Sequence, residues 1–272
     1  MASVVYMRKA AYIVLAVLII GAALYFIHTA PRHGLETIST SQLPTTTTTQ
    51  TSPAVNTPAV GAVRPSFDIK NYEVNYTVVI TVAVGDVSIS MRGWSVEGSG
   101  ALGNYSFGEL YATVPPHGPI KLVFKVATEG RVAYIVTCAG GQCQTEVRPA
   151  NYSTIYLLRG VETSRVEKGP CTYLGYGGVE VEERGRISQE AVAQILGNLA
   201  GNGTGVYTTK ICEVNGVPLK TAGTAYLNIT VYGQRLALTV SIESAAVSAG
   251  PFNEDRYRQV LRETKAAQTA KA

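Results

Sequence analysis

Apolar and polar residues alternate along much of the chain beyond residue 67. In 72-YEVNYTVVITVAV-84, every second residue from Tyr72 onward is apolar or aromatic, and most of the residues between them are polar. Successive side chains of a β-strand point to opposite faces, so this period of two predicts a strand with one buried face. The alternation recurs over 120–127, 225–232 and 236–242. We therefore expect roughly nine or ten strands joined by short turns in an antiparallel meander.

Two glycine-containing sites add detail to this pattern. Asn215-Gly216 is a good type I′ hairpin signal. Gly93 predicts a bulge or bend that moves Trp94 to the other face of its strand.

Residues 187-ISQEAVAQILGNLAG-201 have the periodicity of a helix instead. Ser188 is a good N-cap, Ile187 and Val192 are spaced as a hydrophobic staple, and the apolar residues form one stripe. We expect a helix over 188–200 that packs on the sheet. A second helix, from about 253 to 267, has few apolar residues, which predicts a charged, loosely held tail over 251–272.

These elements define the expected fold class. The chain is predicted to be mainly β, with an antiparallel curled sheet or half-open barrel over 67–250 and one covering helix, preceded by a single transmembrane helix. A single sheet of this length must curl to protect its apolar face.

The apolar segment Ala10–Ile27 carries no charge. As a helix its length is ~27 Å, close to the thickness of a bilayer core. It is too long for a typical cleaved signal peptide, and it only weakly resembles a pilin-type signal, because Pro31 and a long linker follow. We expect a single-pass anchor over 10–29, within an N-terminal segment that spans residues 1–30. Arg8 and Lys9 precede the apolar run and place the N-terminus in the cytoplasm and the C-terminal domain outside the cell.

Residues 31–66 are rich in Thr, Ser and Pro and contain almost no large apolar residues, so they cannot form a core. They are typical of a disordered stalk, either a mucin-type glycosylated one or an inert tether. Five N-glycosylation sequons follow the anchor, which favours an external, glycosylated body, although a Thr-rich β-protein also produces such triplets by chance. Their asparagines are Asn75, Asn104, Asn151, Asn202 and Asn228.

The chain has a formal net charge of +4, but its two ends carry it. Residues 67–250 contain 14 basic and 15 acidic residues, a net charge of −1. The body therefore has no excess of positive charge, and we expect no nucleic-acid partner.

Four cysteines lie beyond the anchor, and disulfides are the default for an even number in an external compartment. Cys138 and Cys143 flank the four-residue loop AGGQ and would face one another across a hairpin, which leaves Cys171 to pair with Cys212. The alternative is a metal site of four thiolates, but the spacing matches no familiar zinc or iron–sulfur pattern.

The residues give little support to catalysis. His117 lies in the turn-like 115-PPHGP-119 without a nucleophile motif, and no paired His or Cys ligands occur in the body. Glu180 and Glu182 share one face if 178–183 is a strand, which a solvated face explains. We assign no catalytic, cofactor-binding or metal-ligating residue and expect a protein that is not an enzyme. A surface hydrolase would need convergent carboxylates around Glu180, Glu182 or Glu109.

The stretch 211-ICEVNGVPLKTAGTAYLNITVYGQRLALTVSIES-244 resembles the closing strands of the lipoprotein-carrier family (LolA- and LppX-like). A cysteine hairpin followed by further cysteines is also similar to archaeal cell-surface proteins. The resemblance implies a half-open β-barrel whose concave apolar face is covered by helices and binds acyl chains. It transfers no site residues, and the anchor departs from the family pattern, which puts a shuttling role in doubt.

The sequence thus supports a membrane-anchored, non-catalytic extracellular β-domain that binds a lipid-like apolar ligand or another envelope component. A structural cell-surface or filament-associated subunit is the alternative, and a surface hydrolase is the second alternative.

Overall fold

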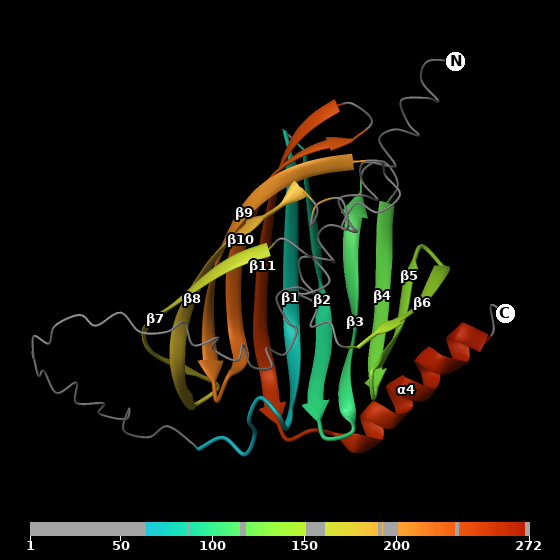
Figure 1. Cartoon of the computed structure of the whole chain (residues 1–272), viewed down its shortest axis with the longest axis vertical. Helices are drawn as coiled ribbons and strands as arrows, with labels where there is room; N and C mark the ends of the chain where they lie inside the picture. The colour runs from blue at the N-terminus through green and yellow to red at the C-terminus, as the bar shows by residue number, and fades with distance from the viewer. Residues whose placement is uncertain are drawn as a thin grey trace, which may run out of the picture.

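The computed structural model describes residues 64–85, 87–114, 118–150, 161–189, 192, 201–231 and 234–269. These residues form one antiparallel sheet of eleven strands, followed by the C-terminal helix α4. Figure 1 shows the curled sheet with α4 against one side of it. The predicted class, a mainly β protein built on a curled, unclosed sheet, is confirmed, while the predicted anchor lies outside the described residues. The elements are β1 Tyr72–Val84, β2 Val87–Gly100, β3 Gly103–Val114, β4 Gly118–Glu129, β5 Val132–Ala139, β6 Gln142–Pro149, β7 Val161–Tyr173, β8 Tyr176–Ile187, β9 Gly201–Val214, β10 Val217–Val231, β11 Gln234–Gly250 and α4 Glu254–Thr269.

The strand order is β6-β5-β4-β3-β2-β1-β11-β10-β9-β8-β7. The sheet therefore consists of two meanders, β1–β6 and β7–β11, that join where β1 pairs with β11. The prediction of one continuous meander was wrong, because β7 begins the opposite edge instead of continuing from β6. This order places β1, the most regularly alternating strand, at the centre, where β2 and β11 flank it on both sides.

The two faces of the sheet follow from the register. We call the face that carries Tyr72, Val74, Val78, Ile80 and Val82 the core face, and the face that carries Glu73 and Asn75 the outer face. Those five core-face residues are at most 1% exposed. Their neighbours across the sheet continue the apolar cluster on both wings, with Met91, Leu110, Leu122, Phe124, Ala225, Leu227, Leu238 and Val240.

Gly93 lies on the core face and makes no bulge, contrary to the prediction. The pairing of β2 with β1 and with β3 continues without a shift through Gly93, so Trp94 follows the normal alternation to the outer face. A Cβ at residue 93 would lie 1.8 Å from the carbonyl oxygen of Glu109. Glycine is needed there because the two backbones approach closely. The predicted Asn215-Gly216 hairpin turn is confirmed, with φ angles of 51° and 78°.

Helix α4 packs across β3–β6 on the outer face, at the lower right of Figure 1. Asn253 caps it, because its side-chain oxygen accepts a hydrogen bond of 3.0 Å from the Arg256 N–H. Tyr257 and Val260 are each 4% exposed and pack in an aromatic cluster with Tyr105, Phe252 and other residues.

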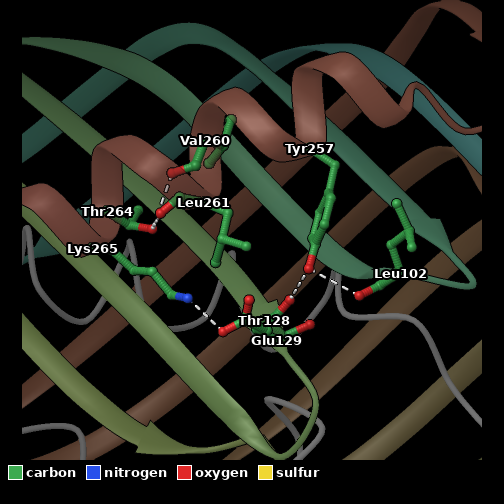
Figure 2. A network of polar contacts seen from close by, with 8 residues as sticks. All are labelled: Leu102, Thr128, Glu129, Tyr257, Val260, Leu261, Thr264 and Lys265. Carbon is green, nitrogen blue, oxygen red and sulfur yellow. Dashed lines mark hydrogen bonds and ion pairs between the residues drawn. The ribbon is translucent and has the colours of Figure 1, made fainter.

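Polar contacts fix the same helix, so the expectation of a loosely held tail was wrong. The Tyr257 hydroxyl shares its proton between the carbonyl oxygens of Thr128 (2.7 Å) and Leu102 (2.9 Å), as Figure 2 shows. Nζ of Lys265 pairs with Glu129 at 2.5 Å, and Gln268 donates to two carbonyl oxygens of β5 and β6. A few large side chains and paired charges replace the broad apolar stripe that a docked helix usually has.

The predicted helix 188–200 falls mostly outside the described residues. Its described start agrees with the prediction, since Gln189 and Val192 are helical and the Val192 N–H donates to the Ser188 carbonyl oxygen at 3.0 Å. Ile187 and Val192 are each 2% exposed and belong to the core-face cluster.

Candidate functional site on the core face

Helix α4 and the apolar core lie on opposite faces of the sheet. Val96, Tyr105 and Ala127, which contact α4, occupy the register positions between those of the core face. Helix α4 therefore gives the core face no cover. The segment before β1 covers one end of it, where Phe67 is 3% exposed and packs edge-to-face on Tyr176 at 5.3 Å.

Charged residues interrupt the core face on the wing β7–β9. Arg165 on β7 and Glu183 on β8 are register partners, and Glu213 on β9 lies near them. The guanidinium Nη1 and Nη2 atoms of Arg165 lie 3.0 and 2.5 Å from the two carboxylate oxygens of Glu213, and Nη1 lies 3.4 Å from Glu183. Two carboxylates thus share one guanidinium, and the formal charge of these three groups is −1.

The burial of the three groups differs sharply. The side chains of Glu183 and Glu213 are 1% and 7% exposed, whereas that of Arg165 is 40% exposed. The cluster therefore lies at the border between the buried core face and solvent. Burying charges is costly unless they are paired and hydrogen-bonded, so this arrangement requires compensating contacts.

Thr209 lies directly opposite Glu183 in the β8–β9 register and shares the core face with it. Its side chain is 7% exposed, and its Oγ1 has no hydrogen-bond partner within the described part of the chain. Val181 and Ile211, two residues further along the same strands, are each 1% exposed. A polar cluster and an apolar surface thus adjoin on one face.

A second set of buried polar residues lies on β2. Ser95, Glu97 and Ser99 alternate on the core face and are at most 4% exposed. Burial, and next the nearby Glu97 carboxylate, raise the pKa of Tyr72 well above its usual value. The core face therefore carries buried polar residues in two places, on the wing β7–β9 and on β2 beside the central strand β1.

The outer face holds a separate polar contact between the sheet and α4. The Tyr105 hydroxyl donates to Glu73, whose other carboxylate oxygen accepts a 2.6 Å hydrogen bond from Arg256. Burial and the hydrogen bond to Glu73 raise the pKa of Tyr105 well above its ordinary value. These residues join the start of α4 to the centre of the sheet, which is a structural role.

Both predicted disulfides are present. Cys138 and Cys143 are register partners across the β5–β6 hairpin, with Cα atoms 4.0 Å apart. Cys171 on β7 bonds to Cys212 on β9, with Cα atoms 6.0 Å apart, and so spans β8. All four thiols are used, which excludes the alternative of a four-thiolate metal site.

The sequons differ in accessibility. Asn202 and Asn228 lie on the outer face and are exposed. Asn75 is half-buried on the same face and donates to Ser248 Oγ at 2.5 Å, while Asn104 is half-buried beside Thr128. Asn151 lies outside the described residues.

The carboxylates considered for hydrolysis do not converge. Glu109 lies on β3, where hydrogen bonds from Lys121 and Tyr111 lower its pKa, and Glu182 lies on β8 in the other wing, paired with Arg184 and Lys168. Glu180 and Glu182 share the outer face as predicted. His117 is outside the described residues, among which no group of three His, Cys, Asp or Glu side chains is placed to hold a metal ion.

Arg165, Glu183 and Glu213 were missed in the sequence. The alternation of Val181, Glu183, Gly185 and Ile187 carried a signal, because a carboxylate stands there in register with apolar residues that face the core. Nothing in the local sequence of β7 marks Arg165 as its partner.

No helix in the described part of the chain is both long and apolar enough to span a bilayer. The segment 10–29 lies outside that part.

No family model matches the sequence, and no characterised protein matches it significantly. Two solved structures are similar to part of it. The lipoprotein LppX of Mycobacterium tuberculosis is 12% identical, with 63% of this chain and 85% of that chain covered and a TM-score of 0.28. A DUF1329 family protein of Desulfovibrio piger is 8% identical, with 66% and 85% covered and a TM-score of 0.27. The first belongs to the LppX-like group that residues 211–244 resemble, but similarity at these TM-scores carries no argument about this chain.

Proposed function

We propose that this chain is a non-catalytic binding protein, held in a membrane by residues 10–29, whose extracellular β-domain takes up an apolar, lipid-like ligand on its core face. One observation carries the proposal. A wide apolar face of a single, unclosed sheet is buried, while helix α4 packs on the other face. The sheet curls around this face, and an apolar ligand held inside the curl would fit its chemistry.

The external location rests on several independent features. The two disulfides suit an oxidising compartment, and the exposed sequons Asn202 and Asn228 suit glycosylation. The apolar segment 10–29 and the Thr-rich stretch 31–66 suit an anchor and a stalk.

The test uses two alanines of β10 that face opposite ways. Ala225 lies in the middle of the core face between Tyr207 and Val240 and is 6% exposed, whereas Ala222 is exposed on the outer face. We propose to release the full-length chain from detergent micelles for native mass spectrometry while titrating a C16 alcohol. The wild type and Ala222→Trp are expected to bind the alcohol, and Ala225→Trp is expected to lose binding.

The same pair of variants separates a ligand from a protein cover. If ligand occupies the space, Ala225→Trp fills it at little cost in stability. If protein side chains already fill the space, the overpacked variant loses about 1–3 kcal/mol or more. An unstable Ala225→Trp together with no binding of the alcohol by the wild type would contradict the proposal.

The second candidate partner is an envelope protein, which would bind the outer face instead of the core face. Val206 and Tyr226 are register partners on the outer face and are 51% and 57% exposed, which favours a protein contact there. Light scattering of the full-length chain in detergent decides whether copies of it associate. A monomer whose mass is unchanged by Tyr226→Ser argues against the structural-subunit alternative.

A further inference from the structure

We propose that the Arg165, Glu183, Glu213 and Thr209 cluster is the headgroup subsite of the core face, and that it selects amphiphiles whose polar end is a primary amine. This inference rests on the proposed function, because it concerns the polar end of the ligand whose apolar part the core face would hold.

The charge balance is the first argument. Arg165 forms ion pairs with both Glu183 and Glu213, so the three groups carry a formal charge of −1 in a largely buried setting. A cation that enters the cluster offsets this charge, whereas a carboxylate or phosphate would add to it. An ammonium group also donates three hydrogen bonds, and carboxylate oxygens are its best acceptors.

The second argument is the Thr209 hydroxyl. It is buried opposite Glu183, and Oγ1 has no hydrogen-bond partner among the described residues. Leaving a buried hydroxyl without a partner costs about 1–3 kcal/mol. A ligand donor placed between Thr209 and Glu183 would remove that cost. The missing hydrogen bond of Thr209 is an observation separate from the ion pairs of Arg165.

The third argument is position. Arg165 is 40% exposed, so the cluster is open to solvent on the side of the edge strand β7. The apolar residues Val181 and Ile211, each 1% exposed, lie on the same face between the Glu183–Thr209 pair and Glu213. An amphiphile would therefore place its head at the solvent border and its chain along the apolar centre of the core face.

The test uses three photoreactive amphiphiles that have the same C12 chain and differ only in the head: a primary amine, an alcohol or a carboxylate. The full-length chain is held in phosphatidylcholine nanodiscs, crosslinked at pH 7 and digested. The labelled peptides of β7–β9 are quantified by mass spectrometry, with the peptides of α4 as the background. In the wild type we expect the amine to label β7–β9 about tenfold more than the carboxylate.

Variants of matched shape sharpen the test. Glu183→Gln combined with Glu213→Gln leaves Arg165 as the only formal charge of the three groups, so the preference should reverse toward the carboxylate. Glu180→Gln, on the outer face of the same strand β8, should keep the wild-type order. Thr209→Val should reduce labelling by the amine several-fold without destabilising the fold, because it removes a buried hydroxyl that has no described partner.

Three outcomes are decisive. Amine-selective labelling of β7–β9 supports the subsite. Equal labelling of these strands by all three heads overturns the subsite and leaves the apolar-ligand function standing. Absence of labelling above the α4 background with every head overturns the proposed function as well. If the double variant does not fold, the comparison of the three amphiphiles on the wild type and the effect of Thr209→Val still test the subsite.

Discussion

Arg165 on β7 and Glu213 on β9 form a two-point ion pair, with distances of 3.0 and 2.5 Å, although strand β8 lies between their strands. The disulfide between Cys171 and Cys212 spans the same three strands. This wing of the sheet is therefore held together by both a covalent and an ionic link across β8.

Removing the guanidinium should destabilise the protein. Arg165→Met leaves the buried carboxylates of Glu183 and Glu213 without this cation, and we expect a loss of about 2–3 kcal/mol, reduced by the partial exposure of Arg165. The measurement is urea unfolding of the full-length chain in detergent. Adding Glu213→Gln to Arg165→Met should recover part of the loss, and a double variant less stable than Arg165→Met alone would contradict this interpretation.

The attachment of α4 should depend on Tyr257. Tyr257→Ala removes a 4%-exposed ring and its hydrogen bonds to Thr128 and Leu102, so we expect a loss of about 3–5 kcal/mol in the docking of the helix. Hydrogen exchange of residues 254–269 reports this directly. Thr264→Val is the control, because the Thr264 hydroxyl bonds only to its own helix in the described structure, and exchange should change little. Equal protection in Tyr257→Ala and the wild type would show that the helix is held by other contacts.

One ion pair of α4 should weaken in acid. Hydrogen bonds from Lys125 and Gln259 lower the pKa of Glu263 below its ordinary value of 4.5. A lowered carboxyl pKa contributes stability above the unfolded value, and this contribution is lost as the pH falls through the folded value. Both side chains of the Lys125–Glu263 pair are more than a third exposed, so the effect should be under about 1 kcal/mol. The free energies of unfolding of Glu263→Gln and of the wild type, measured between pH 7 and pH 3, should differ at pH 7 and converge in acid. A difference that stays constant with pH would contradict the stabilising role of the Lys125–Glu263 pair.

The two disulfides should contribute unequally to the stability of the fold. Closing the 42-residue loop between Cys171 and Cys212 restricts the unfolded chain more than closing the short loop at Cys138 and Cys143, with contributions of about 4 and about 2 kcal/mol in the chain-entropy treatment. Urea unfolding of the two paired Cys→Ser variants tests the order. Peptide mapping without reductant should recover these two pairings, and a linkage between Cys143 and Cys171 would contradict them.

Glycosylation should follow the accessibility of the sequons. We propose occupied sites at Asn202 and Asn228, which are exposed, and low occupancy at Asn75, whose amide donates to Ser248. Mass spectrometry of glycopeptides from the native membrane measures the occupancy of each site. Full occupancy at Asn75 with none at Asn202 and Asn228 would contradict this order.

Local pattern predicted the fold class and most of the strands, with nine or ten expected and eleven found in the described residues. The alternation in β1 and the Asn215-Gly216 turn depend only on neighbouring residues, so they can be predicted from a single sequence. The pairing of β1 with β11 depends on contacts between residues about 170 positions apart, which the pattern of neither strand specifies. The packing of helix α4 was underestimated for a similar reason, since the Tyr257 hydroxyl is held by the carbonyl groups of Leu102 and Thr128, which are far away in the sequence.

The candidate site was harder to predict than the fold. Glu180, Glu182 and Glu183 lie close together on β8, and only the alternation of the strand puts Glu180 and Glu182 on the outer face and Glu183 on the core face. Arg165 joins Glu183 and Glu213 through the order of three strands. Such a cluster can be found in a sequence only when the register of each strand is known.

The most direct test of the central claim is to identify what the native protein holds. The full-length chain is purified from its own membrane in mild detergent, and the lipids extracted from it are quantified by mass spectrometry beside those of Ala222→Trp and Ala225→Trp. We predict one enriched apolar species, near one molecule per chain, in the wild type and in Ala222→Trp, and its loss in Ala225→Trp. The same mixture of bulk membrane lipids in equal amounts from all three proteins would contradict the account.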